Sequence, residues 1–140
     1  MPDARSGDTK VQMRVLLVDD HSDVRALARC YVLAEADAEV VEADNGPAAA
    51  AAVREAGFDL VVVDFHMPGM DGLETTRRIL AERPGTAVVA WTSVIDQGVE
   101  SRFVEAGALR HVPKTETDLL RAVIRERCSA STAPPASAAA

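Results

Sequence analysis

The chain has 140 residues, of which 48% are hydrophobic, and its formal net charge is -7. This length suits one domain that can bury a core without a metal or a disulfide. The acidic balance argues against a sequence-independent nucleic-acid binder, because no basic stripe is present to meet phosphates.

The cysteines and the apolar runs indicate the cellular compartment. Cys30 and Cys128 are far apart and lack the spacing of a zinc or redox motif, so we expect free thiols in a reducing compartment. No apolar run approaches membrane-spanning length, and the N-terminus is polar. The sequence therefore predicts a cytoplasmic protein without a membrane partner.

Five short apolar runs are expected to form buried strands. The third run, LVVV, is unbroken and mostly β-branched, which is typical of a strand that is buried on both faces. Trp91 ends the fourth run and is expected to lie in the core. The five predicted strands are residues 14–18, 39–43, 60–63, 87–91 and 109–112.

A helix is predicted after each strand. In the first helix, apolar residues recur at i, i+3, i+4, i+7 and i+8, which predicts one face packed on a sheet. We expect Ser22 to cap this helix and Gly57 to close the second one. The apolar face consists of Val24, Leu27, Ala28, Tyr31 and Val32. The five predicted helices are residues 22–36, 48–56, 73–82, 96–106 and 116–127.

The alternation of strand and helix predicts a doubly wound α/β fold, with a parallel sheet and helices on both faces. The sequence predicts a polar N-terminal arm over residues 1–12 and a single domain over residues 13–128. Residues 129–140 contain only Ala, Ser, Thr and Pro, which predicts a disordered tail or the start of a linker.

Polar residues follow four of the five predicted strands. Asp19 and Asp20 follow the first strand, Asp64 the third, Thr92 the fourth and Lys114 the fifth. Ligands in such folds sit outside the carboxyl ends of the strands. We therefore expect these side chains to converge at one edge of the sheet.

The residue types at this edge suit phosphoryl chemistry. Three neighbouring carboxylates repel one another, and a hard divalent cation such as Mg²⁺ relieves that repulsion with oxygen ligands. A lysine and a hydroxyl can bind phosphoryl oxygens, while one aspartate acts as the nucleophile. No glycine-rich phosphate loop of the GxxxxGK type is present.

With these residues the chain resembles the receiver domain of two-component response regulators, over about residues 14–127. The resemblance implies the flavodoxin-like (βα)5 fold, with a five-stranded parallel sheet in the order 2-1-3-4-5. It also implies a signalling protein that catalyses only its own phosphorylation and dephosphorylation. The matching residues are Asp19-Asp20, Asp64, Met67-Pro68-Gly69-Met70-Asp71-Gly72, Thr92 and Lys114.

The resemblance assigns a role to each site residue. Asp64 would accept a phosphoryl group from a histidine kinase or a histidine phosphotransfer protein. Thr92 and Lys114 would bind the phosphoryl oxygens. The Mg²⁺ ligands would be Asp19, Asp20, Asp64 and the backbone carbonyl of His66.

The resemblance also implies two partner surfaces. The phosphoryl donor would dock at His21, Val24 and Thr115. The effector protein would bind the surface of residues 96–127. The partners that the resemblance implies also include a second copy of the chain, in a phosphorylation-dependent homodimer. No direct nucleic-acid partner is expected.

The chain departs from the family pattern beside the lysine. Pro113 precedes Lys114 and Thr115 follows it, where the family usually has proline after the lysine. His111 stands where a tyrosine or phenylalanine usually turns inward when Thr92 moves toward the phosphoryl group. Because a histidine can be charged near neutral pH, we expect a pH-sensitive switch. The alternative is a surface histidine without a role.

Two other functions stay open. One is a phosphatase with an aspartyl nucleophile of the haloacid-dehalogenase type, although His66 stands where such enzymes have a second aspartate. The other is a receiver-like binding module that works without phosphorylation. Because no output domain is visible, the chain is expected to be a stand-alone receiver or a piece of a longer regulator.

Overall fold

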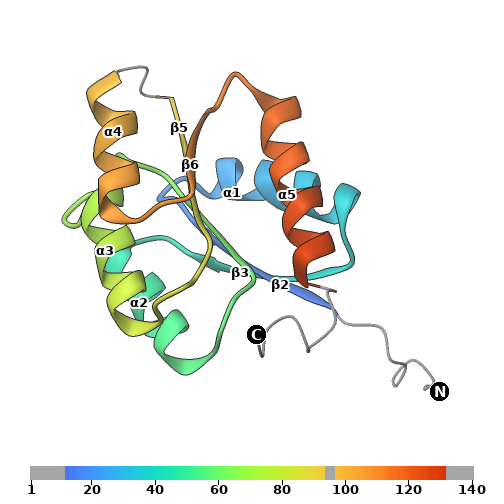
Figure 1. Ribbon diagram of the computed structural model, residues 1–140, viewed down its shortest axis with the longest axis horizontal. Coiled ribbons are helices and arrows are strands. Elements are labelled where there is room, and N and C mark those ends of the chain that lie inside the picture. The colour runs from blue at the N-terminus through green and yellow to red at the C-terminus, as the bar shows by residue number, and fades with distance from the viewer. Residues whose placement is uncertain (1–11, 94–96, 132–140) are drawn as a thin grey trace.

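Figure 1 shows the computed structural model of the chain, which describes residues 12–93 and 97–131. Its centre is a sheet of five parallel strands in the order β3-β2-β4-β5-β6. In chain order this is 2-1-3-4-5, so the predicted fold is confirmed. The strands are β2 (Met13–Val18), β3 (Ala38–Ala43), β4 (Leu60–Val63), β5 (Val88–Thr92) and β6 (Arg110–Pro113).

Five helices cover both faces of the sheet. Helices α1 and α5 lie on one face, and α2, α3 and α4 lie on the other (Figure 1). The helices are α1 (Ser22–Glu35), α2 (Gly46–Glu55), α3 (Gly72–Glu82), α4 (Gln97–Ala106) and α5 (Thr117–Ser131). No helix of the described part of the chain is long and apolar enough to cross a bilayer.

The central strand β4 explains the two-sided core. Its four residues are all buried, and successive side chains point to opposite faces. Leu60 and Val62 join the core under α1 and α5, whereas Val61 and Val63 join the core under α2, α3 and α4. The unbroken apolar run is therefore a consequence of helices on both faces.

Helix α1 differs from the prediction at two positions. Its N-cap is His21 and not the predicted Ser22, which is already the first helical residue, and the His21 side chain makes no capping hydrogen bond. Leu27 is 46% exposed, so its assignment to the buried face was wrong. The buried residues Ala28 and Val32 are about 100° and 140° from Leu27 around the helix, which turns Leu27 toward solvent.

Two helix ends also differ from the prediction. Gly57 does not close α2 in a left-handed conformation; the cap is Ala56, which is extended and donates its N–H to Ala52. Helix α5 continues to Ser131, beyond the predicted end at Arg127. Its last turn contains serine and alanine, and alanine is a strong helix former. The prediction that the tail begins at residue 129, which was based on composition, was therefore wrong for residues 129–131. Residues 1–11 and 132–140 lie outside the described part of the chain.

An acidic residue joins the two helices of one face. Glu35 lies in the last turn of α1, where the helix dipole disfavours an anion. It accepts hydrogen bonds from Arg121 (2.7 Å) and Arg125 (3.0 Å) of α5. The bonds from Arg125 and Arg121 lower the pKa of the Glu35 carboxyl below 4.5.

We expect Glu35→Gln to lower the free energy of unfolding at neutral pH. Because the folded-state pKa is lowered, the stabilisation is present above about pH 4.5 and is lost as pH falls through the folded pKa. Urea unfolding should therefore separate the variant from the wild type at pH 7, and the difference should shrink as the pH falls below about 4.5. The control is Glu39→Gln, at the more exposed pair with Arg14. An equal loss at all pH values would contradict this account.

Candidate functional site

The register of β2 and β4 brings two carboxylates together. Val18 pairs with Val63, so both strands end at the same level of the sheet. Asp19 and Asp64 are the next residues, and the Asp64 N–H donates to the Val18 carbonyl at 3.0 Å. Both carboxylates are buried, at 4% and 6% exposure. A buried charge requires a partner, so these aspartates define a polar site at the carboxyl edge of the sheet.

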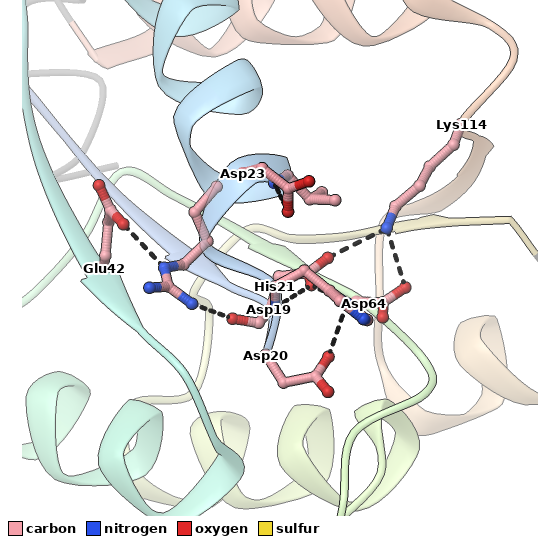
Figure 2. Close-up of polar contacts among 9 residues, drawn as sticks. Asp19, Asp20, His21, Asp23, Glu42, Asp64 and Lys114 are labelled. Carbon is pink, nitrogen blue, oxygen red and sulfur yellow. Dashed lines mark hydrogen bonds and ion pairs between the residues drawn. The ribbon is translucent and has the colours of Figure 1, made fainter.

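Lys114 supplies the opposite charge. Its Nζ lies 3.0 Å from Asp19 Oδ2 and 3.4 Å from Asp64 Oδ1 (Figure 2). Its backbone N–H donates to the carbonyl of Thr92 at 2.8 Å, so this bond to the end of β5 fixes the position of the Lys114 backbone. The structure therefore brings together residues from three strand ends that are far apart in sequence.

The electrostatic environment of Asp64 is mixed. Burial raises the pKa of the Asp64 carboxyl, and the negative charge of Asp19 raises it further. The ammonium group of Lys114 and the N–H of Phe65 oppose this shift, but the net direction is upward. Asp64 is thus held in an environment that disfavours its own charge, which is typical of residues used for chemistry.

Asp20 and His21 lie close to Asp19 and Asp64 in the same site (Figure 2). His21 Nδ1 is 3.3 Å from Asp19 Oδ1 and 3.1 Å from Asp20 Oδ1, although the His21 side chain is 64% exposed. The Asp20 contact lacks the alignment of a hydrogen bond, so the buried Asp20 Oδ1 has no hydrogen-bond partner among the described residues. One ligand atom from each of these three residues lies within 4.8 Å of the others.

The donor set fits a hard divalent cation. Asp19, Asp20 and Asp64 provide carboxylate oxygens, which Mg²⁺ prefers. The unsatisfied buried oxygen of Asp20 is the observation that supports this fit, because such an atom is costly without a partner. The His21 side chain is exposed, yet its Nδ1 also contacts both carboxylates of the acidic pair.

Thr92 and His111 form a second contact on neighbouring strands. Thr92 is fully buried, and its Oγ1 is 3.2 Å from His111 Nε2. The His111 ring stacks on Phe103 of α4, with ring centres 6.4 Å apart and planes 17° from parallel. His111 is therefore not a free surface side chain.

The aromatic contacts continue toward the loop after Asp64. Phe103 meets Phe65 edge-on at 5.9 Å, and Phe65 meets His66 at 4.7 Å. His66 itself is exposed. Its backbone carbonyl as a metal ligand stays a prediction.

Helix α3 holds the loop that follows Asp64. Gly72, its first residue, donates its N–H to the Phe65 carbonyl at 2.8 Å. Asp71 caps the helix by accepting the N–H of Glu74 at 2.9 Å. A Cβ on Gly72 would lie 2.9 Å from both the Asp64 carbonyl carbon and the Phe65 Cα, so only glycine allows this approach.

The predicted docking residues lie near the site with different exposures. His21 and Thr115 are exposed, whereas Val24 is half-buried against the core under α1 and α5. Their role in docking stays a prediction. The Trp91 ring lies under the Lys114 ammonium group, a contact that the sequence does not indicate, because an apolar strand residue carries no signal for a cation contact.

Comparison with known proteins identifies the family. The family model described as response regulator receiver domain matches residues 15–125. The transcriptional regulatory protein LiaR of Bacillus subtilis (strain 168) is 38% identical over 104 residues, which are 74% of this chain and 49% of LiaR. The protein-glutamate methylesterase/protein-glutamine glutaminase 3 of Hahella chejuensis (strain KCTC 2396) is 39% identical over 107 residues, 74% of this chain and 30% of that protein.

A solved structure agrees with these relatives. The two-component response regulator of the LuxR family from Aurantimonas sp. SI85-9A1 is 30% identical, with a TM-score of 0.79. The similarity covers 86% of this chain and 87% of that one. The chain spans half or less of the length of the two curated relatives. With the fold and the acidic edge described above, the chain belongs to the family of response regulator receiver domains of two-component systems.

Proposed function

We propose that the chain is a phosphoacceptor that takes a phosphoryl group from a phosphohistidine onto Asp64. The observation that carries this proposal is the position of Lys114 Nζ between the carboxylates of Asp19 and Asp64, at 3.0 and 3.4 Å. A cation at this point can offset charge on a phosphoryl group that bonds to Asp64.

The chemical step is a displacement at phosphorus. A carboxylate oxygen of Asp64 forms the new P–O bond while the P–N bond to the donor imidazole breaks. Lys114 leaves its contact with Asp64 to meet a phosphoryl oxygen, and the Thr92 hydroxyl donates to another. The burial of Asp64 removes water from the nucleophile and strengthens these charge interactions.

Asp19, Asp20 and Asp64 would hold Mg²⁺ in this site, together with the backbone carbonyl of His66 that the resemblance implies. A bound Mg²⁺ ion would neutralise charge on the transferring group. The chain's own contribution is to keep three carboxylates at one edge of the sheet, where one buried Asp20 oxygen has no hydrogen-bond partner in the described part of the chain.

Incubation with acetyl phosphate and Mg²⁺ tests the proposal. Intact-protein mass spectrometry should show the addition of one phosphoryl group, and EDTA should prevent it, because the carboxylates then repel the incoming group. If no phosphoryl group is added at any Mg²⁺ concentration, the result would favour the alternative of a binding module that works without phosphorylation. Labelling that is unaffected by EDTA would contradict the role of the metal. The phosphatase alternative receives no support from the family assignment.

The surface of residues 97–127 is the proposed output face, and Thr92 with His111 is its switch. The His111–Thr92 contact at 3.2 Å offers a direct link from the phosphoryl site to α4 through the stacked Phe103. The phosphoryl donor, a histidine kinase or a phosphotransfer protein, is proposed to dock at His21, Val24 and Thr115, and the effector at the output face.

We expect the switch to depend on pH. An imidazolium can only donate hydrogen bonds and costs more to bury than the neutral ring, while the acidic site opposes this effect. The fraction of beryllofluoride-activated protein in the inward state, measured by NMR at two pH values, should be smaller at the lower pH. His111→Tyr should remove this dependence. The same active fraction in both proteins at both pH values would contradict a pH-sensitive switch.

A further inference from the structure

Trp91 lies directly beneath the proposed phosphoryl site. It occupies the next-to-last position of β5, one residue before Thr92, and is 4% exposed. Tyr31 of α1 meets its ring edge-on, with centres 6.2 Å apart and planes at 79°. Core packing and this aromatic contact therefore fix the orientation of the indole ring.

The Lys114 ammonium group lies over the face of this ring. Its Nζ is 5.2 Å from the ring centroid, within the range of a cation–π interaction. The same Nζ faces Asp19 Oδ2 at 3.0 Å and Asp64 Oδ1 at 3.4 Å. The lysine side chain, with its flexible four-carbon stem, is thus restrained by the ring as well as by the carboxylates.

Core packing does not by itself explain an indole at this position. Its Nε1–H is buried and has no hydrogen-bond partner among the described residues. Leucine or isoleucine would fill an apolar site without leaving a buried donor unsatisfied. What the indole adds over these side chains is the electron-rich face beneath the ammonium group.

We propose that Trp91 is a positioning residue for phosphoryl transfer, which holds the Lys114 ammonium group at the edge of the sheet by a cation–π contact. This inference rests on the proposed function of the site. The contact does not use the charge of Asp19 or Asp64. It can therefore hold Lys114 in place when those carboxylates bind another partner, as phosphoryl transfer to Asp64 requires.

The sequence makes a specific test available. Trp91 is the single tryptophan of the chain, so biosynthetic incorporation of ring-fluorinated tryptophan changes this ring alone. Fluorine weakens the negative face of the ring while nearly preserving its shape. We expect the rate of phosphorylation by acetyl phosphate to fall stepwise as fluorines are added, and to fall about 3- to 10-fold in Trp91→Leu. Trp91→Phe, which keeps a weaker aromatic face, should lie between the wild type and Trp91→Leu.

NMR provides a readout that does not depend on phosphorylation. Lys10 and Lys114 are the lysines of the sequence, so their ε-methylene protons are readily assigned. The ring current of Trp91 should shift the Lys114 protons upfield, and Trp91→Leu should remove this shift. The matched control is Leu120→Ala, in the same core cluster, which should leave the rate within about twofold and keep the shift.

The outcomes separate this inference from the proposed function. Unchanged rates across the fluorinated series, or no upfield shift in the wild type, would overturn the positioning role while Asp64 phosphorylation stands. Slowing by Leu120→Ala equal to that of Trp91→Leu would assign the effect to core loosening and overturn it as well. A wild type that accepts no phosphoryl group would overturn the proposed function and the positioning role together, and the proton shifts would still decide whether the contact exists.

Discussion

Asp64→Asn should abolish the phosphoryl addition that acetyl phosphate and Mg²⁺ produce in the wild type. The amide is a poor nucleophile and cannot form the acyl phosphate, while its size and shape keep the loop in place. Intact-mass measurement should show no addition, because the nucleophilic oxygen is lost. Labelling of the variant at the wild-type rate would place the acceptor elsewhere.

The stability of the same variant distinguishes lost chemistry from lost folding. Because burial raises the pKa of Asp64, the folded state disfavours its charge at neutral pH. The uncharged amide removes that cost, so the thermal midpoint in the absence of Mg²⁺ should equal or exceed that of the wild type. The matched control is Asp71→Asn in the same loop, which keeps the cap on Glu74 and should be phosphorylated normally.

The sequence predicted the acidic edge because it depends on topology more than on side-chain detail. Parallel strands place all their carboxyl ends at one edge, so polar residues after apolar runs must meet there. Asp19, Asp64 and Lys114 meet as expected, at distances of 3.0 and 3.4 Å. The proposed roles of these residues are a separate question, which only the labelling experiments test.

Other features depend on side-chain direction, which spacing does not determine. The exposure of Leu27 depends on how α1 is rotated about its axis on the sheet. Five apolar residues form an arc too wide to determine that rotation from the sequence. The contact of His21 with both aspartates depends on an extended residue just before α1. Trp91 lies in β5, and Lys114 follows the neighbouring strand β6. No local sequence pattern indicates that the ring and the ammonium group are in contact.

Gly72→Ala is expected to have the second large effect, for a steric reason. The added Cβ would meet the carbonyl oxygen of Asp64 and would lie 2.9 Å from the Asp64 carbonyl carbon and the Phe65 Cα. These are backbone atoms at the end of β4, so they can yield only if Asp64 moves. We expect a loss of about 1–3 kcal/mol in unfolding free energy. Because a displacement of about 1 Å can cost about 100-fold in rate, phosphorylation should slow by tenfold or more.

The sign of the stability change makes this prediction decisive. Gly72 is the first residue of α3, and helix propensity alone favours alanine over glycine by about 1 kcal/mol. Propensity therefore predicts stabilisation, whereas the contact with Asp64 predicts destabilisation. Gly57→Ala is the matched control, since the nearest atom to its Cβ would be Arg83 Nη1 at 3.9 Å and its φ is not positive. Urea unfolding should show Gly57→Ala unchanged or slightly stabilised. If Gly72→Ala behaved in the same way and was phosphorylated at the wild-type rate, the close approach of α3 would not be what holds Asp64.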